Sequence, residues 1–165
     1  MGAKKNVILK FRGKYRFLSN FYPCEVEYEG LVYPSVENAY QAAKTAPFRR
    51  KQFTNISPKK AKQLGKKVPM LYRDWNVRRL KVMEELIRKK FTQNEELKQK
   101  LLETGDAILV EGNTWNDEFW GVNLKKPDPN SEFGYKGQNW LGKILMKVRD
   151  ELRKEQEKGS ESTTE

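Results

Sequence analysis

Three side chains that could carry out chemistry share one face of a short predicted helix. Glu37, Gln41 and Lys44 recur at i, i+4 and i+7, which places a carboxylate, an amide and an amine on the same side of an α-helix. A carboxylate can accept a proton, and an amine can attack an electrophile or hold an anion. The alternative is a solvated stripe, because weakly stabilising i,i+4 pairs are common on exposed helices.

The absence of histidine restricts the chemistry that the chain can perform. It has no histidine and a single cysteine, Cys24, which excludes Ser-His-Asp and Cys-His catalysis and zinc sites built on histidine. Acid–base work near neutral pH must therefore use carboxylates, lysines or tyrosines. Because no Asp/Glu cluster is evident, we expect neither a metal nor a cofactor. A lone cysteine permits no internal disulfide and fits a reducing, cytoplasmic location.

The segment around this stripe contains clear signals for a hairpin followed by a helix. Residues 24–28 and 31–33 read as two strands joined at Glu29-Gly30, and the hairpin can return Ser19-Asn20 towards the helix. Ser35, which follows Pro34, can cap that helix. The predicted buried face consists of Val36, Ala39, Tyr40 and Ala43.

The remaining elements are mostly helical. Ser57-Pro58 predicts a helix ending at Gly65, and a long helix is expected over 73–91, with Val77, Leu80, Met83, Ile87 and Phe91 buried. Short strands are expected over 7–11 and 107–110, a surface loop over 125–137 and a last helix after Asn139. Residues 154–165 contain no apolar side chain and predict a disordered polar tail. We therefore expect an α+β fold: a mostly helical single domain, residues 1–153, with a small sheet.

Four motifs, in order, resemble one protein family. They are FLSNFYP, YPSVENAYQAAK, EGNTWNDEFWG and GQNWLGKILMKVRDEL, and the likeness to the NADAR family of YbiA-like N-glycosidases extends over roughly residues 7–153. The resemblance implies a compact mixed fold with one cleft and hydrolysis of N-glycosidic bonds. Substrates of the family are ADP-ribose attached to guanine, in nucleic acid or nucleotide, and ribosylated pyrimidine intermediates of riboflavin synthesis.

Within these motifs we expect Glu37, Lys44 and Asp117 to be the catalytic residues. A transition state resembling an oxocarbenium ion needs a carboxylate to stabilise the cation or activate water. Lys44 would either form a Schiff base with a ring-opened sugar or hold a phosphate as a point charge. The structural alternatives are that Glu37 only favours the helix dipole, that Asp117 only caps the turn before Phe119-Trp120, and that Lys44 is solvated.

A second set of residues is expected to bind the substrate. Trp75 and Trp120 are candidates for stacking on a base, and Gly121 permits a ligand to approach the backbone closely. The other candidates are polar donors, cations or members of the first motif: Ser19, Asn20, Phe21, Asn139 (as the cap of an anion-binding helix N-terminus) and, more weakly, Arg12.

Net charge points to anionic partners. The chain carries a net charge of +11, and residues 49–100 alone hold 17 Lys/Arg against 5 Asp/Glu. This segment could bind DNA or RNA or a phosphorylated ligand, or it could simply be a solvated lysine-rich surface. No apolar run is long enough for a membrane span. The sequence leaves the oligomeric state open, and it also leaves open a non-catalytic module that binds ADP-ribose or nucleic acid, which would gain support if Glu37 and Lys44 faced solvent.

Overall fold

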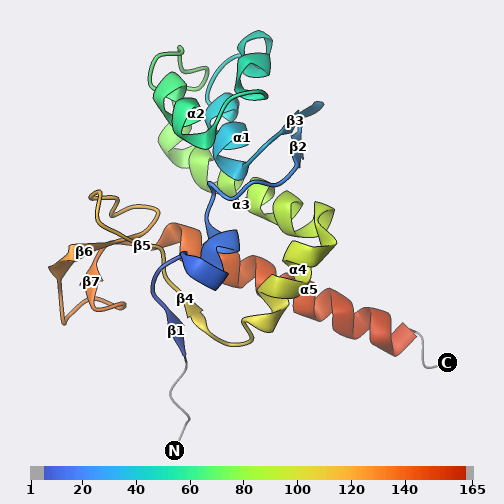
Figure 1. Ribbon diagram of the computed structural model, residues 1–165, viewed down its shortest axis with the longest axis vertical. Helices are drawn as coiled ribbons and strands as arrows, with labels where there is room; N and C mark the ends of the chain where they lie inside the picture. Colours follow the sequence, from blue (N-terminus) through green and yellow to red (C-terminus); the bar gives the residue numbers. More distant parts are fainter. Residues whose placement is uncertain (1–5, 163–165) are drawn as a thin grey trace, which may run out of the picture. The chain divides into compact units, whose positions relative to one another are not determined.

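The computed structural model describes residues 6–162 (Figure 1). The chain forms two compact units. One, called here the central unit, is Asn20–Leu97, and the other, the terminal unit, combines Met1–Ser19 with Lys98–Glu165. Helices dominate, and the strands are short and belong to small sheets. The predicted α+β, mostly helical fold is therefore confirmed, although the described strands form three separate sheets rather than one.

The hairpin of the central unit matches the prediction. β2 (Val26–Tyr28) pairs in antiparallel register with β3 (Leu31–Tyr33), so that Val26 lies opposite Tyr33. The two turn residues both have positive φ, 48° at Glu29 and 91° at Gly30. The backbone twist of a two-residue turn with positive φ matches the right-handed twist of the strands that it joins. Glycine adopts positive φ without steric cost.

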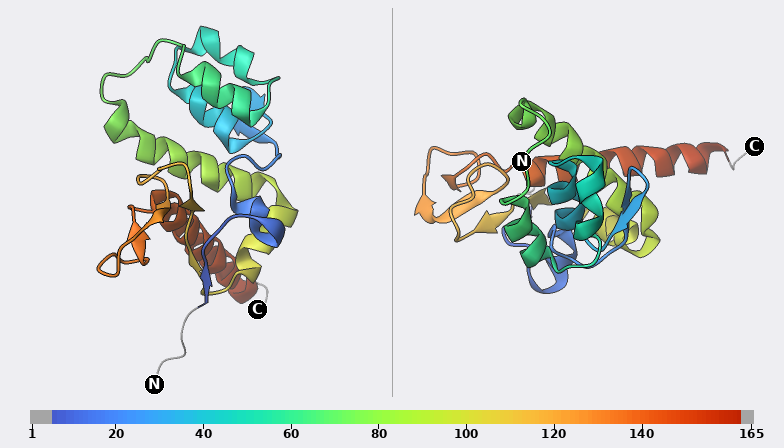
Figure 2. Two further views of the ribbon diagram at one scale, coloured as in Figure 1. Left: turned by 60° about the vertical axis from the view of Figure 1, so that its left-hand side comes forward. Right: turned by 90° about the horizontal axis from the view of Figure 1, so that it is seen from above.

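Four helical segments complete the central unit: α1 (Val36–Ala43), η2 (Pro47–Phe53), α2 (Pro58–Gly65) and α3 (Trp75–Gln93). α1 packs against both α2 and α3, and both figures show α1 and α2 side by side (Figures 1 and 2). As predicted, serines cap the two short helices: the Ser35 side chain accepts from Asn38 N and that of Ser57 from Lys60 N. Every residue of α1 is buried.

The buried face of α3 differs from the prediction at its first turn. Met83, Ile87 and Phe91 are buried as expected, but Val77 is 72% exposed. Trp75, a much larger side chain, is buried at this end of the helix instead. The buried face of α3 therefore begins at Trp75, and Val77 lies on the exposed face. Near the other end Lys90 is completely buried, which no periodicity of apolar residues predicts.

In the terminal unit, β1 (Val7–Ile8) lies parallel to β4 (Ile108–Leu109), and η1 (Gly13–Leu18) follows β1. α4 (Glu95–Glu103) contains the boundary between the two units. The longest helix is α5 (Trp140–Ser162). The last helix expected after Asn139 is confirmed, and four of its side chains belong to the core: Leu141, Leu145, Val148 and Leu152.

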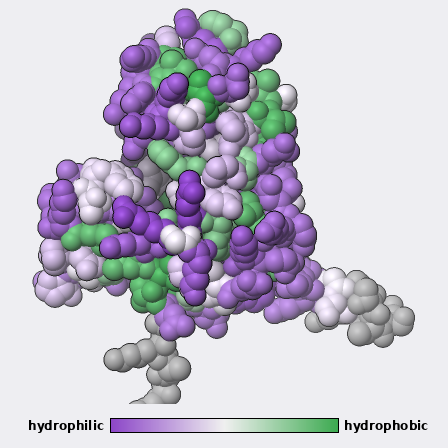
Figure 3. All heavy atoms as spheres, viewed as in Figure 1, coloured by the Kyte–Doolittle hydropathy of each residue, from purple (hydrophilic) through white to green (hydrophobic). Residues whose placement is uncertain are grey.

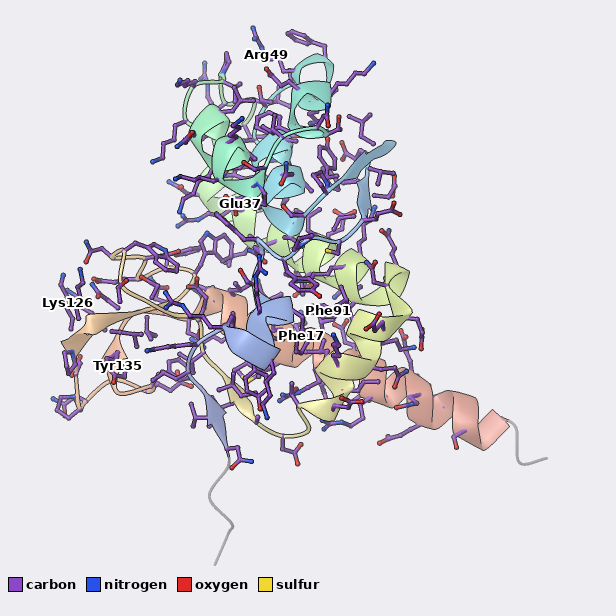
Figure 4. All side chains as sticks on the ribbon, viewed as in Figure 1. Phe17, Glu37, Arg49, Phe91, Lys126 and Tyr135 are labelled. Carbon is purple, nitrogen blue, oxygen red and sulfur yellow. The ribbon has the colours of Figure 1, made fainter. Side chains whose placement is uncertain are left out.

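The segment predicted as a loop, 125–137, contains parts of two strands. β6 (Val122–Pro127) pairs in antiparallel register with β7 (Tyr135–Lys136) and in parallel register with β5 (Gly112–Asn113). Figure 4 labels Lys126 and Tyr135 on the two antiparallel strands. The turn residues that suggested a loop form only the tip of this hairpin, where Asp128 N donates to Gly134 O.

The predicted disordered tail is wrong for residues 154–162, because α5 continues to Ser162. Residues 163–165 lie outside the described part of the chain. Lys, Glu and Gln are good helix formers and extend a helix that packing has already nucleated. An i,i+4 pair between Lys154 Nζ and Asp150 Oδ2, 3.2 Å apart, supports this extension. Among the described helices none is both long enough and apolar enough to cross a bilayer.

Candidate active site

α1 carries the three polar side chains of the predicted stripe. Ser35 fixes where the helix begins, and the backbone N–H of Glu37 donates to the carbonyl of Asn20 at 3.0 Å. Asn20 of the first motif therefore lies against the first turn of α1, as the predicted hairpin required. Figure 4 shows Glu37 on this helix, within the central unit.

The Glu37 carboxylate is buried. Glu37 is 8% exposed and Gln41 is 5% exposed, and Gln41 Nε2 donates to Glu37 Oε1 at 2.8 Å. A solvated stripe would leave both side chains in water, so that alternative is wrong for these two residues. A buried carboxylate held by an oriented amide donor is a group that can act as a base, because its position is fixed and water is largely excluded.

One backbone hydrogen bond and one buried arginine hold the end of α1, where Lys44 is the C-cap residue. Leu71 N donates to Lys44 O at 2.7 Å. Arg50, which is buried, donates from Nε to Ala42 O and Thr45 O at 3.1 Å each, and it forms an ion pair with Glu29. The carbonyls on both sides of Lys44 are thus satisfied by one guanidinium, which fixes the backbone from which the amine projects.

The environment of Lys44 favours the neutral amine. Desolvation by partial burial lowers the pKa of Lys44, and so do the positive charges of Lys62, Lys66 and Arg79, while the Glu37 carboxylate raises it. The amine also lies 5.1 Å from the centre of the Tyr40 ring. An amine with a lowered pKa is a better nucleophile near neutral pH, so both roles expected for Lys44 remain open to it.

Three other predicted residues belong to the same unit. Trp75 is 5% exposed, and its ring centre is 5.5 Å from that of Tyr40, so Tyr40 contacts both Trp75 and Lys44. Asn20 Nδ2 points to the sulfur of Met83, at 3.5 Å, whereas Asn20 Oδ1 is buried with no hydrogen-bond partner among the described residues. Phe21 is 39% exposed. The Asn20 side chain thus offers an acceptor here, where a donor was expected.

Asp117 lies in the terminal unit and caps a turn. Its Oδ1 accepts from Phe119 N at 3.1 Å and from Trp120 N at 2.9 Å. Its own backbone is held by Asn113, which accepts from Asp117 N and donates to Asp117 O. This is the capping geometry anticipated as the structural alternative; the catalytic role of Asp117 stays a prediction.

Close packing explains the glycine that follows Trp120. A Cβ on Gly121 would lie 1.9 Å from Glu111 Oε2 and 2.0 Å from Glu111 O, so only glycine fits between Trp120 and Val122. The Trp120 ring packs edge-on against Phe119, with 4.7 Å between ring centres. The loop therefore has a fixed conformation that presents Trp120, which is partly exposed.

Asn139 serves the fold of the terminal unit. It is fully buried with φ at 54°, its Nδ2 donates to Leu109 O and its Oδ1 accepts from Glu111 N, both at 2.9 Å. The expectation that this side chain caps the last helix is wrong, because both amide atoms bind backbone outside the helix. Ser19 is the C-cap residue of η1, and Arg12, which is exposed, is the residue directly before η1.

A model of the NADAR domain matches residues 9–153. The chain belongs to the NADAR family. It is 33% identical to the N-glycosidase YbiA of Escherichia coli over 142 residues, covering 84% of this chain and 82% of that protein. An N-glycosidase of Nostoc punctiforme is 34% identical over 145 residues, covering 84% of this chain and 86% of the relative.

Two further similarities extend this result. A riboflavin biosynthesis protein of Vibrio vulnificus is 39% identical over 139 residues, which cover 82% of this chain but only 35% of that longer protein. The NMR structure of E. coli YbiA superposes with a TM-score of 0.76 at 30% identity, covering 93% of this chain and 89% of that one. The resemblance inferred from the four motifs is thus confirmed at the level of both family and fold.

Sequence reasoning identified only some residues of this candidate site. The central unit contains four of the predicted site residues: Asn20, Glu37, Lys44 and Trp75. For Glu37 and Lys44 the signal was their helical spacing. The helical spacing also placed Gln41 beside Glu37 without assigning it a function. Arg50 was missed, because its partners at the end of α1 follow from the tertiary fold and leave no local signal. Within the described part of the chain, no three Cys, Asp or Glu side chains gather as they would around a metal ion.

Proposed function

We propose that this protein hydrolyses N-glycosidic bonds, with Glu37 as the general base. The observation that carries the proposal is the buried Glu37 carboxylate, held by Gln41 at 2.8 Å and followed two turns later on the same helix by an amine of lowered pKa. The relatives from E. coli and Nostoc, similar over most of their length, carry the name N-glycosidase.

The reaction needs few groups. Water adds to the anomeric carbon as the bond from that carbon to the base nitrogen breaks, the proton of the water passes to a base, and the departing nitrogen takes up a proton. Glu37 accepts the proton from water and stabilises the developing positive charge on the sugar. In one role, Lys44 adds in place of water to the anomeric carbon of the ring-opened sugar; the bond from that carbon to the base nitrogen breaks, the base leaves with a proton, and water hydrolyses the resulting Schiff base to the sugar and the free amine. In the other role, Lys44 holds a phosphate of the substrate.

The charge around Lys44 favours a substrate rich in phosphate. Between Glu37 and Asp74 the chain contains ten Lys/Arg and no Asp/Glu. Lys62 on α2, Lys66 directly after α2 and Arg79 on α3 influence the pKa of Lys44 electrostatically, so this basic segment reaches the site. Of the two substrate classes of the family, a diphosphate-containing ADP-ribosyl group on guanine suits this field better than a ribosylated riboflavin intermediate with a single phosphate.

The same segment supports nucleic acid as the carrier of the modified guanine. On the face shown in Figure 3, hydrophilic side chains dominate the surface over α2 and η2. Phe48 in η2 is 80% exposed, and the Arg49 guanidinium lies 5.0 Å from the centre of its ring. An exposed aromatic beside cations is the arrangement on which single-stranded bases stack. We propose that η2 and α2 guide an oligonucleotide to the site.

Mass spectrometry distinguishes the substrates. The protein is incubated separately with an oligonucleotide containing ADP-ribosylated guanine, with the same modified guanosine as a free nucleotide, and with the ribosylated pyrimidine intermediate of riboflavin synthesis. We expect release of ADP-ribose from both guanine substrates, and none from either with Glu37→Gln. Turnover of the riboflavin intermediate alone would reassign the substrate, and turnover of none of the three would remove the enzymatic proposal.

Removal of charge tests the nucleic-acid contact. Phe48→Ala combined with Lys59→Gln and Lys60→Gln, all exposed, should lower kcat/KM for the modified oligonucleotide while leaving the free nucleotide unaffected. Lys125→Gln with Lys126→Gln, exposed in the terminal unit, is the matched control. An equal loss on oligonucleotide and nucleotide would contradict a guiding role for η2 and α2. Glu37 is buried and Lys44 is half-buried, which argues against the non-catalytic binding module, since that alternative was to gain support if both residues faced solvent.

A further inference from the structure

Gln41 lies between the Glu37 carboxylate and the end of α2. Its Nε2 donates to Glu37 Oε1 at 2.8 Å. Its Oε1, on the other side of the same amide, is buried and has no hydrogen-bond partner among the described residues. The amide cannot be turned over, because Oε1 would then face the Glu37 carboxylate and repel it. The carboxylate therefore fixes which way the Gln41 amide points.

Gly65, the last residue of α2, provides the space for the oxygen end of that amide. A Cβ on Gly65 would lie 1.9 Å from Gln41 Oε1 and 2.7 Å from Gln41 Cδ, closer than any real contact. The two short helices pack against each other, and the absence of a side chain at Gly65 permits the contact. Positive φ is not the reason for this glycine, because Gly65 does not have it.

From this arrangement we infer that Gln41 is a positioning residue for Glu37, and that Gly65 determines its position. The inference rests on the proposed role of Glu37 as the base. Gln41 touches the carboxylate and leaves a buried acceptor unsatisfied, at a cost to the stability of the fold. An apolar side chain would avoid that cost, so the amide is better explained by what its donor end does for Glu37 than by stability.

The substitution Gly65→Ala moves this amide without touching Glu37. The two nearest atoms, Oε1 and Cδ, belong to the flexible end of Gln41, whereas Gln41 Cβ would lie 3.2 Å from the new methyl group. The end of the Gln41 side chain must therefore move, and the two helices need to give by only a few tenths of an ångström. Alanine is also favoured over glycine in helices, which keeps the fold stable. Displacement of a catalytic group by about 1 Å can lower a rate by roughly 100-fold.

The experiment is a double-mutant cycle on turnover of the ADP-ribosylated guanosine nucleotide. We expect Gly65→Ala to lower kcat about 10- to 100-fold, with KM within about twofold and the melting temperature within about 3 °C of wild type. Gln41→Ala should lower kcat similarly, and Gly65→Ala should have little additional effect in that background, because the group it displaces is gone. Full additivity of the two losses would overturn the inference.

Gly159→Ala is the control and should leave kcat unchanged. Gly159 also lies in a helix, and a Cβ placed on it would meet nothing within 4 Å, its own helix backbone aside.

A second readout does not need activity. The side-chain NH₂ signals of Gln41 in NMR spectra should exchange slowly in wild type and become fast in Gly65→Ala. Slow exchange in both proteins, or a wild-type kcat in Gly65→Ala, would show that Gly65 does not set the position of Gln41. If no substrate is turned over, the NMR result still decides the structural claim.

Discussion

Replacing the buried lysine of α3 by methionine should stabilise the protein at neutral pH. Lys90 is fully buried, and burial lowers its pKa from 10.5 to about 8. The charge of Cys24 opposes this shift only where the thiol ionises, and burial raises the pKa of that thiol. The aromatic rings of Tyr22 and Phe91 lie 5.8 Å and 5.1 Å from the amine and supply some compensation for the charge. Methionine has a similar shape and length and carries no charge to desolvate.

The magnitude follows from the difference between the two pKa values. At about 1.4 kcal/mol per pH unit, that difference corresponds to roughly 3 kcal/mol. Below pH 8 the amine is charged in the folded and the unfolded chain, so the folded state bears the whole cost. Between pH 8 and 10.5 the unfolded chain binds a proton that the folded protein lacks, and the stability contributed at this residue rises with pH. The advantage of methionine should therefore be largest at about pH 7 and nearly gone above pH 10.5.

Urea unfolding of Lys90→Met and of wild type, at about pH 7 and about pH 10, measures the size of the stabilisation and its dependence on pH. Comparison with wild type at each pH removes the contributions of other groups, such as Tyr28 and Tyr33, whose pKa values burial raises to about 12. Lys81→Met, at an exposed position on the same helix, is the control and should change stability by less than about 0.5 kcal/mol at either pH. Equal stabilisation by Lys90→Met at both pH values, or destabilisation at neutral pH, would refute the reasoning.

Three more substitutions test other contacts. Asn139→Ala removes the hydrogen bonds to Leu109 O and Glu111 N and should cost about 3 kcal/mol, which lowers the melting temperature by roughly 6–12 °C. Asn55→Ala, at an exposed loop position, should change the melting temperature little, and a small effect at Asn139 would show that its hydrogen bonds are dispensable. Glu37→Gln should abolish turnover with the melting temperature preserved, and retention of most of the rate would exclude Glu37 as the base. If Lys44 forms a Schiff base, borohydride during turnover should add mass to the Lys44 peptide, and Lys44→Arg should lose most activity; no adduct and a raised KM with kcat preserved would indicate a phosphate contact.

Local signals in the sequence were sufficient for the elements around the site. Ser35 and Ser57 are helix caps, and Glu29-Gly30 is a hairpin turn, because each uses a side chain or a backbone preference that acts within a few residues. The same reasoning placed Glu37 and Lys44 on one helix face. The same reasoning failed at Val77, which is exposed although it lies three residues before Leu80, whereas Trp75, outside the predicted stripe, is buried.

The contacts that hold the site together were beyond sequence reasoning. Arg50 binds the end of α1, and Gly65 accommodates Gln41, through the way that separate helices pack. Asn139 was read as a cap because it precedes a helix, yet its side chain bonds to backbone 28 and 30 residues away. A residue type at a helix start indicates a possible cap, whereas the available partners in the folded chain determine which bonds form.

The complete burial of α1 has a consequence for the redesign of this enzyme. All eight positions of the helix are buried, so a library of variants at these positions would mostly return unfolded proteins. The exposed segment 69–71 is different, because Leu71 is 45% exposed and its backbone nevertheless bonds to Lys44. Altered substrate range should therefore be sought by diversifying this segment, where side chains change freely while the backbone contact with Lys44 persists.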